Sequence, residues 1–382
     1  MNELHLQDKF LIPFFRDGLG YKEVKANTVT QSLIIEEDLQ AFIEGSSLNQ
    51  KPYEVLLKKY KGDKKTLLQD LMTLLAERIA SSRNMALFIN ANKSITLQGI
   101  KLHLFYTSDS VIHGNALFDE NIFSVVQELP YKFNYQGTQI FSFRPDLVLF
   151  VNGIYIGYSE LKSNYTSQSA RKNGRGKVLK DYFEAVKVYH QHIDCNTMLS
   201  DKEKQHIRKN FLKIFESAIH ITTTDIGETY VIRTIADYFD EVLATCREGK
   251  FDREEIEKKA QSVFKLYPLL NRDAEKKDQL KELFATLYSR LMIEKEILYY
   301  NFIERDVYVN KGVKEVKNEQ GHLISPRPKQ KFGTDKIMAK IDELLAHEQE
   351  PDYFEKLLEK QLVGVSETKK NELLEKRRAY SN

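Results

Sequence analysis

The first 95 residues place hydrophobic side chains mostly at the three-to-four spacing of helices. The clearest pattern lies in residues 64–82, KKTLLQDLMTLLAERIASS. One buried face of a helix would collect its apolar positions, which are Leu68, Leu71, Leu75 and Ile79. A shorter helix is predicted over residues 33–43, LIIEEDLQAFI. Residues 1–95 are therefore predicted to be mostly helical.

The pattern changes near residue 97, where Val, Ile, Phe and Tyr become frequent between short turn signals. This change is typical of strands, which we predict near residues 100–107, 122–133, 138–151 and 154–162. A helix over residues 177–192 and an apolar strand over residues 218–224 follow. The order of strands, helix and strand indicates a mixed α/β core over residues 96–228.

From about residue 230 onward the pattern predicts helices again. Residues 283–303 are apolar and aromatic at helical spacing, which favours core packing over a partner surface. The predicted organisation is a helical region over residues 229–308, a polar and basic linker over residues 309–333, and C-terminal helices over residues 334–382.

Composition adds limits to this picture. The 382 residues suggest two or three structural units, and the net charge of +2 gives no sign of a polyanionic partner by itself. Cys195 and Cys246 are the only cysteines, too few for a disulfide framework or a cysteine-based zinc site. The start MNELHLQDKF does not resemble a signal peptide, and no window approaches the ~20 apolar residues of a membrane span. We expect a cytoplasmic protein without a membrane partner.

Charged residues stand at the end of a strongly apolar hairpin in residues 141–164, FSFRPDLVLFVNGIYIGYSELKSN. Asn152-Gly153 is a turn signal, and the flanking strands are apolar on both alternating faces, which predicts burial on both sides. The charged residues of interest are Asp146, Glu160 and Lys162. Charges are costly to bury unless they are paired or bound to a metal. These residues are therefore candidates for a site, with an ion pair at a strand end as the simpler alternative.

The strand register decides whether the charges meet, because side chains alternate between faces. With a plain two-residue turn, Asp146 would lie opposite Ser159, and Glu160 and Lys162 would lie on the other face. With a three-residue loop, Asp146 would lie opposite Tyr158 and share a face with both. We therefore predict a three-residue loop or another one-residue bulge.

The chemistry that fits these residues is metal-assisted phosphodiester hydrolysis. Mg²⁺ prefers hard oxygen ligands, which Asp146, Glu160 and the backbone carbonyl of Leu161 would supply. A metal lowers the pKa of bound water and stabilises a leaving oxygen. Lys162 would orient the water or neutralise developing charge.

At these residues the sequence resembles the PD-(D/E)xK nuclease superfamily, and more narrowly the N-terminal nuclease region of the Type I restriction enzyme R subunit. The phrase RPDLVLFVNGIYIGYSELKSN carries most of the resemblance, which covers about residues 8–225 and is close over residues 121–164. It implies a restriction-endonuclease-like core and endodeoxyribonuclease activity. It also implies Asp146 and Glu160 as Mg²⁺ ligands and Lys162 as the catalytic lysine.

The sequence departs from this pattern at two points. Many such nucleases carry a Gln-x-x-x-Tyr motif on the following helix, where Tyr182 fits the tyrosine but Val178 replaces the glutamine. No G-x-x-x-x-G-K-[S/T] phosphate loop is present, and the glycine-rich residues 173–177 have the wrong spacing. We expect this chain neither to hydrolyse ATP nor to move DNA, whether it is a fragment or a complete relative of the nuclease part.

Cations after the hairpin are predicted to contact DNA phosphates, because such contacts dominate non-specific affinity. They are Arg171, Lys172, Arg175, Lys177 and Lys180, and a solvated loop is the alternative. Glu77 is considered as an additional acid near the metal, against an exposed helix charge. His190 and His192 lack the spacing of a helical zinc pair and are interpreted as structural.

The leading hypothesis is a Mg²⁺-dependent, restriction-type endonuclease without its own ATPase motor. Its partners would be DNA and, by resemblance, the modification and specificity subunits of a restriction complex. The alternative is a non-catalytic DNA-binding or assembly module, in which the hairpin is a relic and the C-terminal helices dock onto partner subunits.

Overall fold

The computed structural model of the chain describes residues 7–81, 93–107, 116–162, 175–215, 219–224, 228–233, 239–249 and 267–270, together with residues 288, 290 and 293. The chain forms two compact units, Met1–Ser325 and Pro326–Asn382, and every described residue belongs to the first. Helices and strands both make up large parts of the described residues, which confirms the mixed α/β class.

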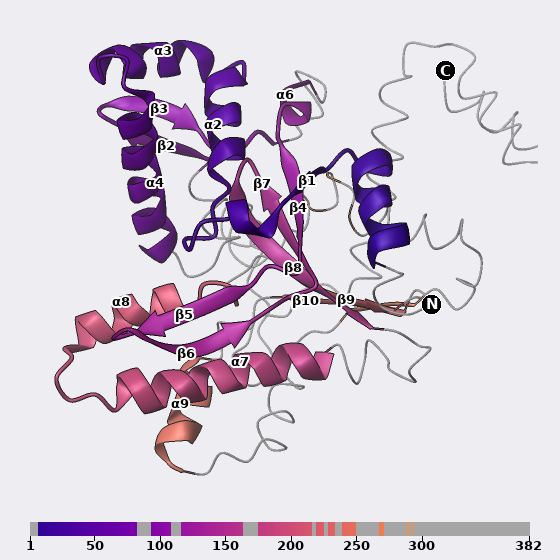
Figure 1. Cartoon of the computed structure of the whole chain (residues 1–382), viewed down its shortest axis with the longest axis vertical. Coiled ribbons are helices and arrows are strands. Elements are labelled where there is room, and N and C mark those ends of the chain that lie inside the picture. The colour runs from indigo at the N-terminus through magenta and orange to yellow at the C-terminus, as the bar shows by residue number, and fades with distance from the viewer. Residues whose placement is uncertain are drawn as a thin grey trace, which may run out of the picture. The chain divides into compact units, whose positions relative to one another are not determined.

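The centre of the first unit is a seven-stranded sheet in the order β1-β4-β7-β8-β9-β10-β11 (Figure 1). Its strands are β1 (Lys22–Val24), β4 (Phe123–Gln127), β7 (Leu147–Val151), β8 (Ile154–Lys162), β9 (Ile219–Thr224), β10 (Glu228–Arg233) and β11 (Tyr267–Leu270). β7 pairs antiparallel with β4 and β8, whereas β1 and β9 run parallel to their neighbours β4 and β8. The hairpin β7–β8 thus lies inside the sheet.

Two small sheets accompany it: β2 (Ser94–Leu97) with β3 (Ile100–His103), and β5 (Tyr131–Tyr135) with β6 (Thr138–Phe143). The helices before the hairpin are α2 (Glu36–Gly45), α3 (Gln50–Lys59), α4 (Lys64–Ser81) and α6 (Ala116–Asp119), with the short π-helices η1 (Gln7–Leu11) and η2 (Phe14–Gly18) and the 3-10 helix η3 (Ala26–Thr28). Those after it are α7 (Arg175–Tyr189), η6 (His190–Asp194), α8 (Asp201–Leu212) and α9 (Phe239–Arg247).

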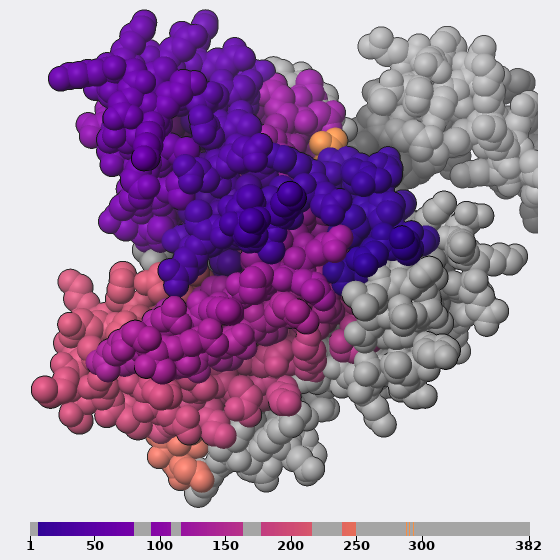
Figure 2. All heavy atoms as spheres, viewed as in Figure 1, coloured from indigo at the N-terminus to yellow at the C-terminus, as the bar shows by residue number. Residues whose placement is uncertain are grey.

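The sheet is covered so thoroughly that every residue of β7 and β8 is buried. Figure 1 shows α7 and α8 beside the β5–β6 sheet, and aromatic contacts from Phe143 to Tyr158 and Phe215 join this group to the hairpin. On the face drawn in Figure 2, N-terminal residues in indigo adjoin the magenta residues of β5 and β6. Burial on both sides is what the two apolar faces of the hairpin predict.

The first turn of α2 holds the tip of the hairpin. Ile35 donates its backbone N–H to the carbonyl of Gly153 at 2.9 Å. A Cβ on Gly153 would lie 2.3 Å from the Ile35 carbonyl oxygen, and the residue has a φ of +77°. Glycine is therefore required at this position both for backbone conformation and for close approach.

Two predicted strands are divided by proline. Residues 122–133 form β4 and β5, separated near Pro130, and residues 138–151 form β6 and β7, separated near Pro145. In each pair, one strand joins the large sheet and the other joins the small sheet. The prediction of continuous strands was wrong because proline has no N–H for the ladder.

The segment between the predicted helix 177–192 and the predicted strand 218–224, for which no element was predicted, contains α8. Ser200 and Glu203 form a capping box at its start, which is a recognisable helix signal in the sequence. The expectation that the chain is helical from about residue 230 was also wrong where β10 and β11 extend the sheet.

Other predictions reach beyond the described residues. In the predicted helix 283–303, Tyr288 and Ile293 are helical and fully buried, in agreement with core packing. The linker over residues 309–333 and the helices over residues 334–382 lie outside the described residues. The large sheet contains strands from both sides of the predicted domain boundaries at residues 95 and 228. Within the described residues, no helix has the length and apolar character to cross a membrane.

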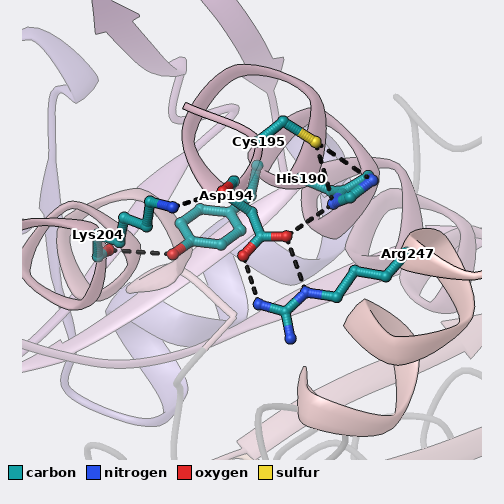
Figure 3. Close-up of polar contacts among 6 residues, drawn as sticks. His190, Asp194, Cys195, Lys204 and Arg247 are labelled. Carbon is teal, nitrogen blue, oxygen red and sulfur yellow. Dashed lines mark hydrogen bonds and ion pairs between the residues drawn. The ribbon is translucent and has the colours of Figure 1, made fainter. Parts of the chain in front are cut away.

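Asp194 ends η6, which follows α7, and ties it to α8 and α9 (Figure 3). Its carboxylate accepts from Arg247 Nε at 2.9 Å and Nη2 at 2.5 Å, and Oδ2 lies 2.8 Å from His190 Nδ1. Its backbone carbonyl accepts from Lys204 at 2.7 Å. Cys195 lies near His190, and these donor atoms gather within 4.8 Å. Arg247 holds both carboxylate oxygens of Asp194, and the structural role of His190 stays a prediction.

Candidate active site

The hairpin reaches the predicted arrangement through a bulge. Asn152 and Gly153 have φ values of 50° and 77°, which belong to a two-residue turn between the paired Val151 and Ile154. The register then shifts, because Phe150 pairs with Tyr155 whereas Leu149 pairs with Gly157. The three-residue loop was therefore wrong, and the alternative of a one-residue bulge is confirmed.

The turn itself is fixed by the buried side chain of Asn152. Its Oδ1 accepts from the Ile122 N–H at 2.7 Å, and its Nδ2 donates to the Leu104 carbonyl at 2.9 Å and to Asn121 Oδ1 at 2.8 Å. An asparagine tolerates the left-handed backbone conformation that the turn requires. The polar turn residue can be buried because its side chain is fully bonded.

The bulge places the acidic residues together. Val148 pairs with Tyr158, so continuing the alternation by two residues sets Asp146 and Glu160 on one face, followed by Lys162. The Leu161 N–H donates to Asp146 Oδ2 at 2.6 Å, which joins the two strand ends. The backbone carbonyl of Asp146 is held by the Glu128 N–H at 2.9 Å. The predicted face is therefore shared.

Glu160 is fully buried at this point. Its Oε2 lies 2.6 Å from Lys177 Nζ and 3.8 Å from Lys162 Nζ. Within the described part of the chain, its Oε1 is buried without a hydrogen-bond partner. Burial, reinforced by repulsion from Asp146, raises the pKa of Glu160 to about 8. A carboxylate in this position gains most from a cation.

Lys162 is hydrogen-bonded to the Leu161 carbonyl, which the sequence indicates as a metal ligand. Its Nζ donates to Leu161 O at 2.5 Å, and its side chain is only 9% exposed. Two ammonium groups, those of Lys162 and Lys177, thus lie against oxygens of Leu161 and Glu160. These oxygens form a surrounding that suits positive charge.

Asp181 is a member of this group that the sequence reasoning missed. It lies four residues after Lys177 on α7, on the same side of the helix. Among the described residues, its buried Oδ2 has no hydrogen-bond partner. Burial raises the pKa of Asp181, while the charges of Lys177, Lys180 and Lys162 oppose the rise. The spacing to Lys177 was the available signal.

The remaining predicted residues differ in placement. Tyr182 is buried and contacts the ring of Phe215 at 5.6 Å between centroids. Lys180 is exposed on α7. Arg175 begins that helix, although its side chain is outside the description, and Arg171 and Lys172 lie outside the described residues altogether.

Glu77 belongs to a different place in the fold. Its side chain is exposed on α4 and lines a pocket with Thr30, His206 and Asn210. The pocket lies between α4, the segment before α2 and α8. The structure therefore does not bring Glu77 to the group around Glu160.

The donor set fits a magnesium ion. Asp146 and Glu160 supply carboxylate oxygens, and Leu161 supplies a carbonyl oxygen beside them. Among the described residues, Glu160 Oε1 has no hydrogen-bond partner, so this oxygen is available as a metal ligand. Hard oxygen donors are the ligands that Mg²⁺ prefers.

A comparison with models of protein families matches residues 1–193 to the Type I restriction enzyme R protein N terminus. This range covers half of the chain and includes the hairpin and the whole of α7. No curated protein and no solved structure matches the chain.

Proposed function

Because the chain belongs to the Type I restriction enzyme R protein N-terminus family, whose members are parts of restriction systems, we propose that it is a Mg²⁺-dependent endonuclease of the PD-(D/E)xK type. The observation that supports this proposal best is the buried Glu160, whose Oε1 has no hydrogen-bond partner among the described residues and lies in a group with Asp146 and Lys162. Such a costly carboxylate is characteristic of catalytic sites.

The metal would be held by the carboxylates of Asp146 and Glu160 and by the carbonyl of Leu161. When bound, Mg²⁺ supplies a Lewis acid that polarises the phosphate and lowers the pKa of a coordinated water. The backbone bond from Leu161 to Asp146 fixes one carboxylate in place before any substrate arrives. This preorganisation is the main contribution of the hairpin to catalysis.

Lys162 would act on the reacting groups. Its ammonium lies 3.8 Å from Glu160 Oε2 on the same strand face. Released from the Leu161 carbonyl, it would donate to the attacking water or to the scissile phosphate and neutralise charge that develops there. Burial restricts the conformations of the Lys162 side chain, because few rotamers are available to a long side chain inside the protein.

DNA would approach along the start of α7. Lys177 and Lys180 belong to this helix, which follows the segment that carries the other predicted cations, Arg171, Lys172 and Arg175. Contacts from such residues to phosphates bind DNA without reading its sequence. Recognition would then depend on modification and specificity subunits of the restriction complex.

The direct test is cleavage of plasmid DNA in Mg²⁺ and in EDTA. The wild-type chain should cut only with Mg²⁺, and Asp146→Asn and Lys162→Met should each lose at least about 100-fold in rate. Lys58→Met, an exposed charge change on α3, is the matched control and should cut normally. Cleavage retained by both site variants would reject the proposal.

The non-catalytic DNA-binding module is the second candidate. It is favoured by the ammonium groups of Lys162 and Lys177, which already lie on oxygens of Leu161 and Glu160. This candidate predicts equal DNA binding with and without Mg²⁺ and no cleavage by the wild-type chain. The same plasmid assay, combined with a binding measurement, separates the two.

A further inference from the structure

Lys177 bridges the buried acid and the surface. Its Nζ lies 2.6 Å from Glu160 Oε2, yet its side chain is 35% exposed whereas that of Glu160 is not exposed at all. Lys162, the other ammonium near Glu160, is 9% exposed and donates to the adjacent Leu161 carbonyl. Lys177 is thus the partner of Glu160 that can leave for solvent without being pulled from the core.

The position of Lys177 conflicts with a metal on the same carboxylate. An ammonium at 2.6 Å from Glu160 Oε2 and a divalent ion on that carboxylate would lie within a few ångströms of each other. Like charges this close repel strongly in a partly buried site, and the repulsion doubles for a divalent ion. Metal binding therefore favours a conformation in which Lys177 has moved away.

A phosphate is the natural second partner for this ammonium. Lys177 lies in the first turn of α7, next to Arg175 and in the segment predicted to follow the DNA backbone. A lysine on a flexible four-carbon chain can exchange one anion for another over several ångströms. Breaking the ion pair with Glu160 would cost little free energy when the Lys177 ammonium gains a DNA phosphate as its new partner.

We propose that Lys177 is an exchangeable counter-ion that couples metal binding to DNA binding. It neutralises Glu160 when metal and DNA are absent, and it transfers to a DNA phosphate when DNA binds, which opens Glu160 to the metal. Each ligand then strengthens the other, as linkage between two binding equilibria requires. The inference rests on the proposed role of Glu160 as a metal ligand.

The consequence would be that little of the protein carries metal when no DNA is bound. In the absence of DNA, the ammonium competes with Mg²⁺, so the site is filled mainly in the complex that can be cut. Lys177 is in this sense a positioning residue, because it controls the availability of Glu160. A purely structural ion pair would give no such dependence of metal affinity on DNA.

The test measures the affinity of the full chain for Mn²⁺, a spectroscopic substitute for Mg²⁺, from the electron paramagnetic resonance signal of the free ion. Titrations are made with and without a short DNA duplex for the wild type, Lys177→Met, Lys177→Arg and Lys58→Met. Lys58 is exposed on α3 and is not one of the cations predicted to contact DNA, so its variant controls for the loss of one positive charge. Circular dichroism checks that each variant folds.

For the wild type, DNA should tighten Mn²⁺ binding about tenfold, within the usual range of coupling between sites. Lys177→Met should bind Mn²⁺ about tenfold more tightly without DNA, and DNA should add little. Loss of the ammonium also favours protonation of Glu160, but a divalent ion gains twice as much as a proton from removing the same repulsion. Lys177→Arg should retain the coupling, and Lys58→Met should match the wild type with and without DNA.

Unchanged or weaker Mn²⁺ binding by Lys177→Met would overturn the inference, since a supporting residue gives the opposite sign to a competitor. Glu160→Gln separates this failure from failure of the proposed function. If Glu160→Gln abolishes Mn²⁺ binding while Lys177→Met does not tighten it, only the exchange is rejected. If Glu160→Gln leaves Mn²⁺ affinity unchanged, the metal site itself is rejected and the exchange with it.

Discussion

The backbone N–H of Leu161 donates a 2.6 Å hydrogen bond to Oδ2 of Asp146. This bond connects the end of β8 with the residue that precedes β7, and it holds Asp146 close enough to Glu160 for its charge to raise the pKa of that residue. Two carboxylates are thus kept near each other by the backbone at a cost in stability. Functional sites often carry such a cost, which a bound cation relieves.

Substitution Asp146→Asn should therefore remove function without lowering stability. The amide oxygen can still accept from Leu161, and the repulsion on Glu160 is lost. In EDTA, the melting temperature should equal or exceed that of the wild type. With metal at ten times its Kd, the wild type should gain about 1.4 kcal/mol, whereas Asp146→Asn should gain nothing. Thermal unfolding in both buffers decides the matter, and a marked drop in EDTA would contradict the explanation.

Gly153→Ala should be far more damaging than Gly137→Ala. Both glycines have positive φ, +77° and +80°, but a Cβ on Gly153 would lie 2.3 Å from the Ile35 carbonyl and one on Gly137 would meet nothing within 4 Å. Gly137→Ala should cost about 1 kcal/mol for the backbone conformation alone. Gly153→Ala should cost at least about 3 kcal/mol because α2 must also shift. Urea unfolding gives both values, and equal losses would refute the steric argument.

A site that joins Asp146, Glu160 and Lys162 on one face requires an extra residue in the hairpin, and the sequence was sufficient to predict that residue. It was not sufficient to place that residue. Both the loop and a bulge satisfy the alternation of side chains, and the choice depends on contacts with distant chain. Ile34 pairs with Ile154, and Ile35 bonds to Gly153, which favours the tight turn and moves the irregularity to Leu149 and Phe150.

Local signals and distant contacts explain the other differences. The start of α8 could have been found, since Ser200 and Glu203 have the spacing of a capping box. The pair between Lys177 and Glu160 could not, because in the sequence Lys177 is one of several cations and nothing fixes which one turns inward. The strand β1 was also missed, because its three residues gain their structure from pairing with β4, in which Lys22 meets Ser124 and Val24 meets Val126.

Asp38→Ala should destabilise the N-terminal part of the sheet. The fully buried carboxylate accepts from Ser124 Oγ at 2.6 Å and from Lys22 Nζ at 2.7 Å, which connects α2 with β4 and β1. Its loss leaves Ser124 buried without this partner, at a cost of about 2 kcal/mol. Glu37→Ala is the control, because Glu37 contacts the same lysine at 3.2 Å but is 76% exposed. It should change stability by less than about 0.5 kcal/mol, and chemical unfolding of both variants measures the difference.

The connection between Asp194 and Arg247 should weaken in acid. Arg247 first, and His190 after it, lowers the pKa of Asp194 from 3.8 to about 2. A carboxyl whose pKa is depressed by folding contributes stability that is complete above its unfolded pKa and is lost as the pH falls through its folded pKa. The contribution should therefore be constant from pH 7 to about 5 and should disappear between about pH 4 and pH 2. Arg247→Met should cost about 1 kcal/mol at pH 7, because the arginine itself is largely exposed.

The pH dependence of this pair is best measured as a difference between variants, since many carboxyl groups titrate below pH 5 and destabilise the wild type and Arg247→Met alike. Urea unfolding at pH 7, 5, 4 and 3 should show a difference in unfolding free energy between the two proteins that narrows only at pH 4 and pH 3. Asp194→Asn should lower stability at pH 7 and show no further loss when combined with Arg247→Met, beyond about 0.5 kcal/mol. A gap that stays constant down to pH 3 would mean that Arg247 stabilises α9 through packing of its side chain and not through the carboxylate of Asp194.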